Sequence, residues 1–140
     1  MENVVTSDLR TEIAKSPERQ AYEILHWGFV AAPVLAGLDK FAGLLTNWDA
    51  YVAPPIASML GGATHAFMLV VGIVEIAAGL LVAVKPRIGA WVVAGWLGGI
   101  IVDLLMSGRW FDVALRDFGL MLAALALGRL ATVYDRPRSR

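Results

Sequence analysis

The sequence predicts an all-α integral membrane protein, a four-helix bundle with both ends of the chain in the cytoplasm. Three observations predict this class. Hydrophobic residues make up 58% of the 140 residues, four apolar segments are each long enough to cross a bilayer, and the basic residues gather on alternate connections. Helices are expected despite the many Val and Ile residues, because a spanning segment must satisfy its own backbone hydrogen bonds.

The predicted spans are 24–41, 63–84, 88–106 and 113–133. Each is close to the roughly 17 to 25 apolar residues that cross a hydrocarbon core about 30 Å thick. The chain therefore divides into a polar cytoplasmic segment over 1–20, a transmembrane domain over 21–133 and a basic cytoplasmic tail over 134–140. Within the first segment, 6–15 is expected to form a short surface helix.

Helix boundaries and orientation follow from a few residues. Ser16-Pro17-Glu18 is typical of a helix start, with a capping hydroxyl and a proline in the first turn. With the N-terminus inside, nine basic residues lie on inner segments and only Lys40, Arg109 and Arg116 on outer ones. Because basic loops stay in the cytoplasm, this asymmetry predicts an inner-membrane protein with both termini inside. The connection 43–62 is then an outer surface loop or short helix that caps the bundle.

Glu75 is the charged residue predicted to lie deepest in the membrane. It falls near the middle of 63–84, where a charge costs roughly 2.5 to 3.5 kcal/mol on insertion scales. Helical spacing places His65, Gly72 and Gly79 on the same face. We therefore expect this face to point into the bundle.

Several polar residues join Glu75 in the outer half of the bilayer, and they predict a polar pocket that is open or gated toward the outside. No residue is assigned as catalytic, but Glu75 and His65 are the candidates for proton handling. The candidate ligand-binding residues are Lys40, Trp48, Asp103, Arg116 and Asp117.

Structural roles for the same residues stay open. Asp103 and the Arg116-Asp117 pair could form an interhelical ion pair, and Glu75 could be a paired or protonated structural acid. The histidines could serve packing, while Asp39 and Asp49 are interpreted as ordinary interfacial charges. Gly95, Gly99 and Asp103 recur at four-residue steps, which predicts a helix-packing seam.

Composition excludes several functions. The chain has no cysteine, so thiol chemistry and cysteine-ligated clusters are not open to it alone. Its twelve basic and twelve acidic residues balance, so no nucleic-acid partner is expected. Two histidines without ligand spacing predict no metal site.

Several short motifs resemble those of the DoxX-like family of small four-helix membrane proteins. They are Gly37-Leu38-Asp39-Lys40-Phe41, the aromatic and proline-rich segment after it, the run from Gly72 to Leu81, and the basic turn that follows. The resemblance covers about 21–131 and carries over Lys40 and Glu75 by position. It implies a membrane setting for quinone-coupled oxidation or for complexes that hold redox enzymes.

Together these observations favour a membrane subunit of a redox or respiratory assembly, with no cofactor of its own and a quinone or other small organic ligand in the outer pocket. Its partners would be the lipid bilayer and other membrane or redox subunits that supply the electrons. The alternative is a non-catalytic anchor or assembly subunit. A transporter is disfavoured, because four helices make a narrow bundle without an evident discontinuous pair.

Overall fold

The computed structural model describes residues 1–135, and all regular structure in that range is helical. The predicted basic cytoplasmic tail includes Arg136, Arg138 and Arg140, which lie outside the described residues. The α-helices are α1 (Glu2–Lys15), α2 (Pro17–Ala42), α3 (Pro54–Leu60), α4 (Thr64–Val84), α5 (Pro86–Met106) and α6 (Phe111–Tyr134), and the 3-10 helices are η1 (Trp48–Tyr51) and η2 (Gly61–Ala63).

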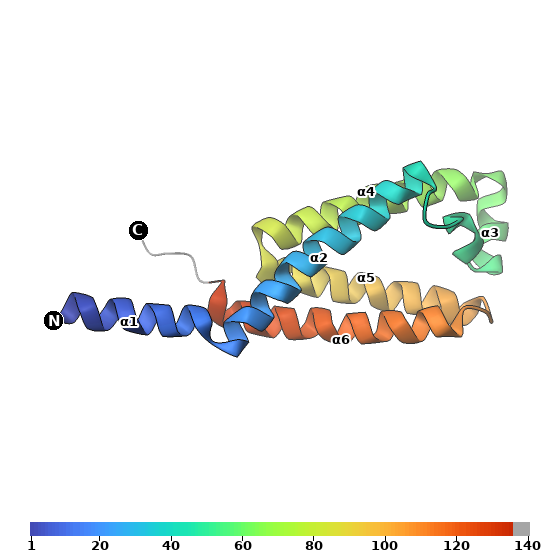
Figure 1. The fold of residues 1–140 in the computed structure, drawn as a ribbon. Coiled ribbons are helices and arrows are strands. Elements are labelled where there is room, and N and C mark those ends of the chain that lie inside the picture. The colour runs from blue at the N-terminus through green and yellow to red at the C-terminus, as the bar shows by residue number, and fades with distance from the viewer. Residues whose placement is uncertain (136–140) are drawn as a thin grey trace.

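The four longest helices pack as two antiparallel pairs, α2 with α4 and α5 with α6 (Figure 1). The pairs also meet through α4 with α5 and α2 with α6. They converge near the turn at Lys85, which we call the closed end, and diverge toward the connection 43–63, which we call the open end. The helical class predicted from the sequence is thus confirmed.

Within the described residues, three stretches are long and apolar enough to cross a membrane. They are Pro17–Ala42, Pro54–Val84 and Pro86–Met106. The predicted span 113–133 is helical as part of α6, but this helix is not among the three. Asp112, Arg116 and Asp117 lie in its first turns, and they lower its mean hydropathy.

Local sequence explains where the long helices begin and end. The Ser16 hydroxyl accepts a hydrogen bond from the Arg19 amide at 3.2 Å, and Pro17 is the first helical residue of α2, which confirms the predicted start. Gly43 ends α2 in the left-handed region at φ 65°, a conformation that glycine adopts without strain. Pro86 begins α5 directly after the turn.

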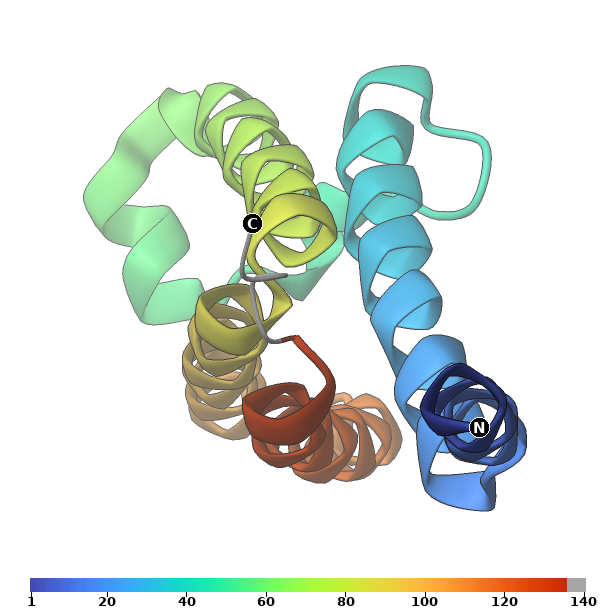
Figure 2. The same cartoon turned by 90° about the vertical axis from the view of Figure 1, so that its left-hand side faces the viewer.

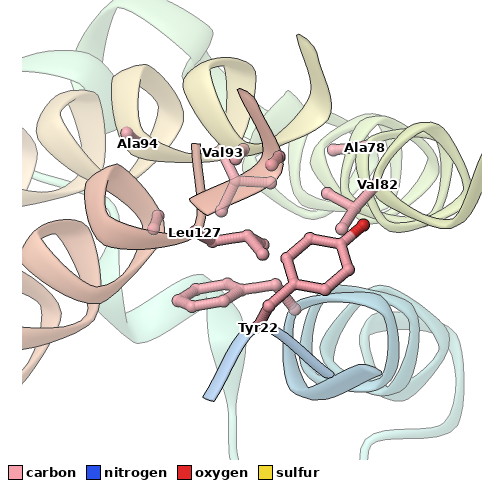
Figure 3. Close-up of a cluster of buried hydrophobic side chains, with 10 residues drawn as sticks. Tyr22, Ala78, Val82, Val93, Ala94 and Leu127 are labelled. Carbon is pink, nitrogen blue, oxygen red and sulfur yellow. The ribbon is translucent and has the colours of Figure 1, made fainter. Parts of the chain in front are cut away.

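The closed end holds the hydrophobic core. Apolar residues from all four long helices meet there: Tyr22 and Phe29 from α2 pack with small and medium residues such as Val82 and Leu127, which are fully buried (Figure 3). A Cβ added to Gly89 would lie 2.6 Å from the Val82 backbone. Glycine at this position therefore lets α4 and α5 approach closely just beside their connecting turn.

The connection 43–63 forms the predicted cap at the open end. It contains η1, α3 and η2, and its residues Val52 and Ala53 are buried. The Ala53 amide donates a hydrogen bond to Asp103 Oδ1 at 2.9 Å. This bond ties the connection to the end of α5.

Helix α1 stands apart from the other helices. It begins at Glu2, four residues before the predicted start, and every one of its residues is exposed. Figure 1 shows it extending beyond the closed end, and Figure 2 shows it end-on, parallel to the long axis of the helical body.

Candidate functional site

A buried ion pair links α2 to α4. Lys40 Nζ lies 2.6 Å from Glu75 Oε2, and the two side chains are only 3% and 10% exposed. The predicted inward face of α4 is confirmed at Gly72, Glu75 and Gly79, which are buried. Because each charge neutralises the other, an acid and a base can both occupy an apolar seam.

Glycines bring the two helices close enough for this pair to form. A Cβ on Gly37 would lie 2.5 Å from the Gly72 carbonyl oxygen, and one on Gly72 would lie 2.8 Å from the Gly37 carbonyl oxygen. The seam continues at Gly79, where a Cβ would meet the Val30 carbonyl oxygen at 2.9 Å. The backbones are therefore in direct contact on both sides of Glu75.

The Trp48 ring covers the ammonium group of Lys40. Lys40 Nζ lies 3.7 Å from the centroid of this ring, within the range of a cation–π interaction. The Trp48 Nε1–H donates to Asp39 Oδ2 at 2.8 Å. Asp39 thus fixes the ring above the neighbouring lysine.

Asp39 also organises the backbone that follows α2. Its Oδ1 accepts from the Leu44 amide at 2.9 Å, and its two oxygens accept from the Leu45 amide at 3.2 and 3.1 Å. The residue is only 6% exposed, so the interpretation as an ordinary interfacial charge is wrong. In the sequence, the buried role of Asp39 is marked only by the glycine that ends α2 and by the tryptophan that follows soon after it.

An open depression lies beside Lys40 at the open end. Its volume is about 280 Å³. Its lining residues are Lys40, Gly43, Thr46, Asn47, Trp48, Asp49 and His65. Of the predicted pocket residues, three line this space: Lys40, Trp48 and His65.

His65 lies at the rim and apart from Glu75. Its side chain is 68% exposed, and its Nδ1 is 3.0 Å from Asp49 Oδ2. The hydrogen bonds of Glu75 and His65 therefore go to different partners, and no direct contact joins the two predicted proton-handling groups.

The other predicted ligand residues have separate positions. Asp103 accepts the hydrogen bond from the Ala53 amide, Arg116 is exposed, and Asp117 is half-buried. Among the described residues, no salt bridge links Asp103 to Arg116, so that proposed interhelical pair is not formed.

The predicted glycine seam on α5 does not face the other helices. Gly95 and Gly99 are exposed, and a Cβ at either position would meet no atom within 4 Å. Among the described residues, glycines pack closely between α2 and α4 and, at Gly89, between α4 and α5.

The Lys40 ammonium is caged between Glu75 and the Trp48 ring, and Lys40 is one of the residues that line the depression. One N–H of the Lys40 ammonium points to Glu75 and its charge lies over the Trp48 ring. An ammonium has three N–H donors, but the Lys40 side chain is only 3% exposed, so a ligand oxygen reaches it only where the Trp48 ring moves aside. No group of three or more metal-ligating side chains occurs in the part of the chain that the structure describes.

Comparison of the chain with protein-family models, curated proteins and solved structures finds no match.

Proposed function

We propose that this chain is a DoxX-like inner-membrane protein with four spans and cytoplasmic termini, and that it binds a small organic molecule at the open end as a membrane subunit of a redox or respiratory assembly. The observation that carries the proposal is the buried Lys40–Glu75 ion pair, whose lysine is one of the residues that line the depression. A membrane protein retains an intramembrane charge of this kind chiefly for function or for a fixed partner.

The lining residues fit the head group of a quinone. A quinone head group is a flat ring with carbonyl oxygens, so Lys40 would donate a hydrogen bond to one oxygen and Trp48 would contact the ring. The remaining lining residues are mostly polar, which suits a head group better than an apolar tail. When bound, the quinone would accept electrons that a partner protein supplies.

Each residue of the site would have a limited role. Glu75 holds the Lys40 ammonium in place and balances its charge. Asp39 positions the Trp48 ring. His65 and Asp49 lie at the rim, where they can exchange protons with water.

A binding measurement with a short-tailed, water-soluble quinone tests the proposal in nanodiscs that contain the whole protein. The Lys40→Met/Glu75→Leu double variant removes the donor without leaving a buried charge. We expect its affinity to fall about ten- to a hundredfold, because a hydrogen bond from a charged donor contributes about 1.5 to 3 kcal/mol. The control is Trp91→Leu, at an exposed position on α5 far along the chain from the depression. Equal affinity in the double variant and the parent would exclude this site.

The exposed glycines of α5 favour a second candidate function, that of a non-catalytic assembly subunit. Gly95 and Gly99 lie four residues apart, and a Cβ at either would meet no atom of the described residues within 4 Å; such faces promote contact between membrane helices. Under this function, a larger complex survives gentle detergent extraction of the parent. Gly99→Leu would dissociate it, whereas Gly119→Leu, at another glycine without neighbours, would not.

A further inference from the structure

The apolar stripe of α1 is unpartnered in the structure. Val5, Leu9 and Ile13 follow one another at four-residue steps and so share one face of the helix. Their side chains are 57%, 52% and 57% exposed. A helix of 14 residues with no buried residue is marginally stable in water, so this face needs a partner to keep the helix folded.

The direction of α1 argues against the membrane surface as that partner. Both views show α1 parallel to the long axis of the helical body and beyond its closed end (Figures 1 and 2). If that axis crosses the bilayer, as the proposed topology requires, α1 projects about 21 Å away from the membrane. An interfacial helix instead lies in the membrane plane.

The charges beside the stripe argue in the same direction. On the helical wheel Glu2 and Glu12 are the charged residues nearest the centre of the stripe, within about 60°, whereas Arg10 and Lys15 lie about 100° and 120° from it, one on each side. Helices that bind membrane surfaces carry Lys and Arg at their polar face, because the lipids are anionic. Acids beside an apolar stripe are complementary to a groove with basic rims.

We propose that α1 is a docking helix for a cytoplasmic protein. Its apolar stripe would bind in a groove of that protein whose rims carry Lys or Arg. This inference rests on the proposed topology, but it does not require the ligand site at the open end. It assigns to the N-terminal segment the recruitment of a soluble partner to the membrane.

Cysteine labelling in native membranes tests the proposal, because the chain has no cysteine of its own. Leu9→Cys places the reporter on the stripe, and Ser7→Cys places a matched reporter on the opposite side of the same helix. Both are labelled with a membrane-impermeant maleimide in inside-out vesicles. We expect Leu9→Cys to react several-fold more slowly than Ser7→Cys, and the difference to disappear after a wash that strips peripheral proteins.

A charge reversal sharpens the test. In the Leu9→Cys background, Glu12→Lys should abolish the protection, whereas Thr11→Lys, on the side of the helix opposite the stripe, should leave it. Equal labelling before the wash would overturn the proposal. Protection that survives the wash would also overturn it, in favour of lipid or a second copy of the chain.

The same reagents separate this inference from the topology on which it rests. Labelling of Ser7→Cys in intact spheroplasts but not in inside-out vesicles would place α1 outside and contradict the topology itself. Labelling only in inside-out vesicles, with no difference between the two cysteines, would contradict the docking helix alone.

Discussion

The closed and open ends of the helical body are stabilised by different means. At the closed end, apolar residues from all four long helices fill the core, with one buried polar contact between a His26 ring nitrogen and the Val82 carbonyl oxygen at 2.9 Å. At the open end the helix pairs diverge, and polar contacts around Lys40, Glu75 and Asp39 hold α2, α4 and the connection together. Apolar packing tolerates change in proportion to volume, whereas a buried polar contact fails when one partner is lost. The open end thus depends more on polar contacts than the closed end does.

The largest effect is expected from breaking the ion pair at the open end. Glu75→Leu leaves the Lys40 ammonium buried without its partner, and should lower the free energy of unfolding by about 3 to 5 kcal/mol. The Lys40→Met/Glu75→Leu double variant should recover most of this loss, since no lone charge remains. Reversible unfolding in mixed micelles, followed by circular dichroism, measures both. A double variant as unstable as Glu75→Leu would show that the charge balance is not what stabilises the seam.

Removing volume from the closed end should have the next largest effect. Leu127 is fully buried in the core, so Leu127→Ala should cost about 2 to 5 kcal/mol through lost contacts and a cavity. Leu122 on the same helix is 50% exposed, and Leu122→Ala serves as the matched control with a change within about 0.5 kcal/mol. The same unfolding measurement applies. Similar losses in the two variants would mean that the core is not closed where the structure places it.

Substitution of a glycine in the α2–α4 seam should lower stability by a smaller amount, and an exposed glycine on α5 provides the control. Gly37→Ala would place a Cβ 2.5 Å from the Gly72 carbonyl oxygen, so the helices must separate, at a cost of about 1 to 3 kcal/mol. Gly95→Ala meets no atom within 4 Å and should leave stability unchanged or slightly raised, because alanine favours helices. If Gly95→Ala destabilises the protein in native membranes only, a partner helix occupies that face.

The sequence was sufficient to predict the helices but not the contacts between them. Long apolar segments and the Ser16-Pro17 start specified α2, α4 and α5, because these signals are local. The resemblance carried over both Lys40 and Glu75, yet their pairing depends on how α2 and α4 are rotated against each other. That rotation also brings Gly37 and Gly72 together, and the rotation of α5 leaves Gly95 without a contact.

Asp39 illustrates the same limit at one residue. Its partners are the amides of Leu44 and Leu45 and the indole of Trp48, so its burial depends on a turn that the sequence only marks by Gly43. A charged residue near a predicted membrane boundary is usually exposed. The turn folds the connection back over the carboxylate and makes it structural.

Loss of the Asp39 contacts should release the connection that covers Lys40. Asp39→Asn replaces one acceptor oxygen by an amide group that faces donors, and should cost about 1 to 3 kcal/mol because buried donors lose their acceptor. The rate of chymotryptic cleavage after Trp48 or Tyr51 in the folded protein should rise. Cleavage at the parent rate would show that the connection is held without Asp39.

The contact between Asp49 and His65 should contribute least, although it joins the same connection to α4. His65 is 68% exposed, and an exposed pair of this kind contributes about 0.2 to 1 kcal/mol because water screens it. Asp49→Asn should therefore change the unfolding free energy by no more than that amount and leave chymotryptic cleavage near the parent rate. Asp39→Asn is the matched comparison, since it makes the same chemical change ten residues earlier at a buried position. If Asp49→Asn opens the connection as fully as Asp39→Asn does, then the rim contact and not the buried carboxylate keeps Trp48 over Lys40.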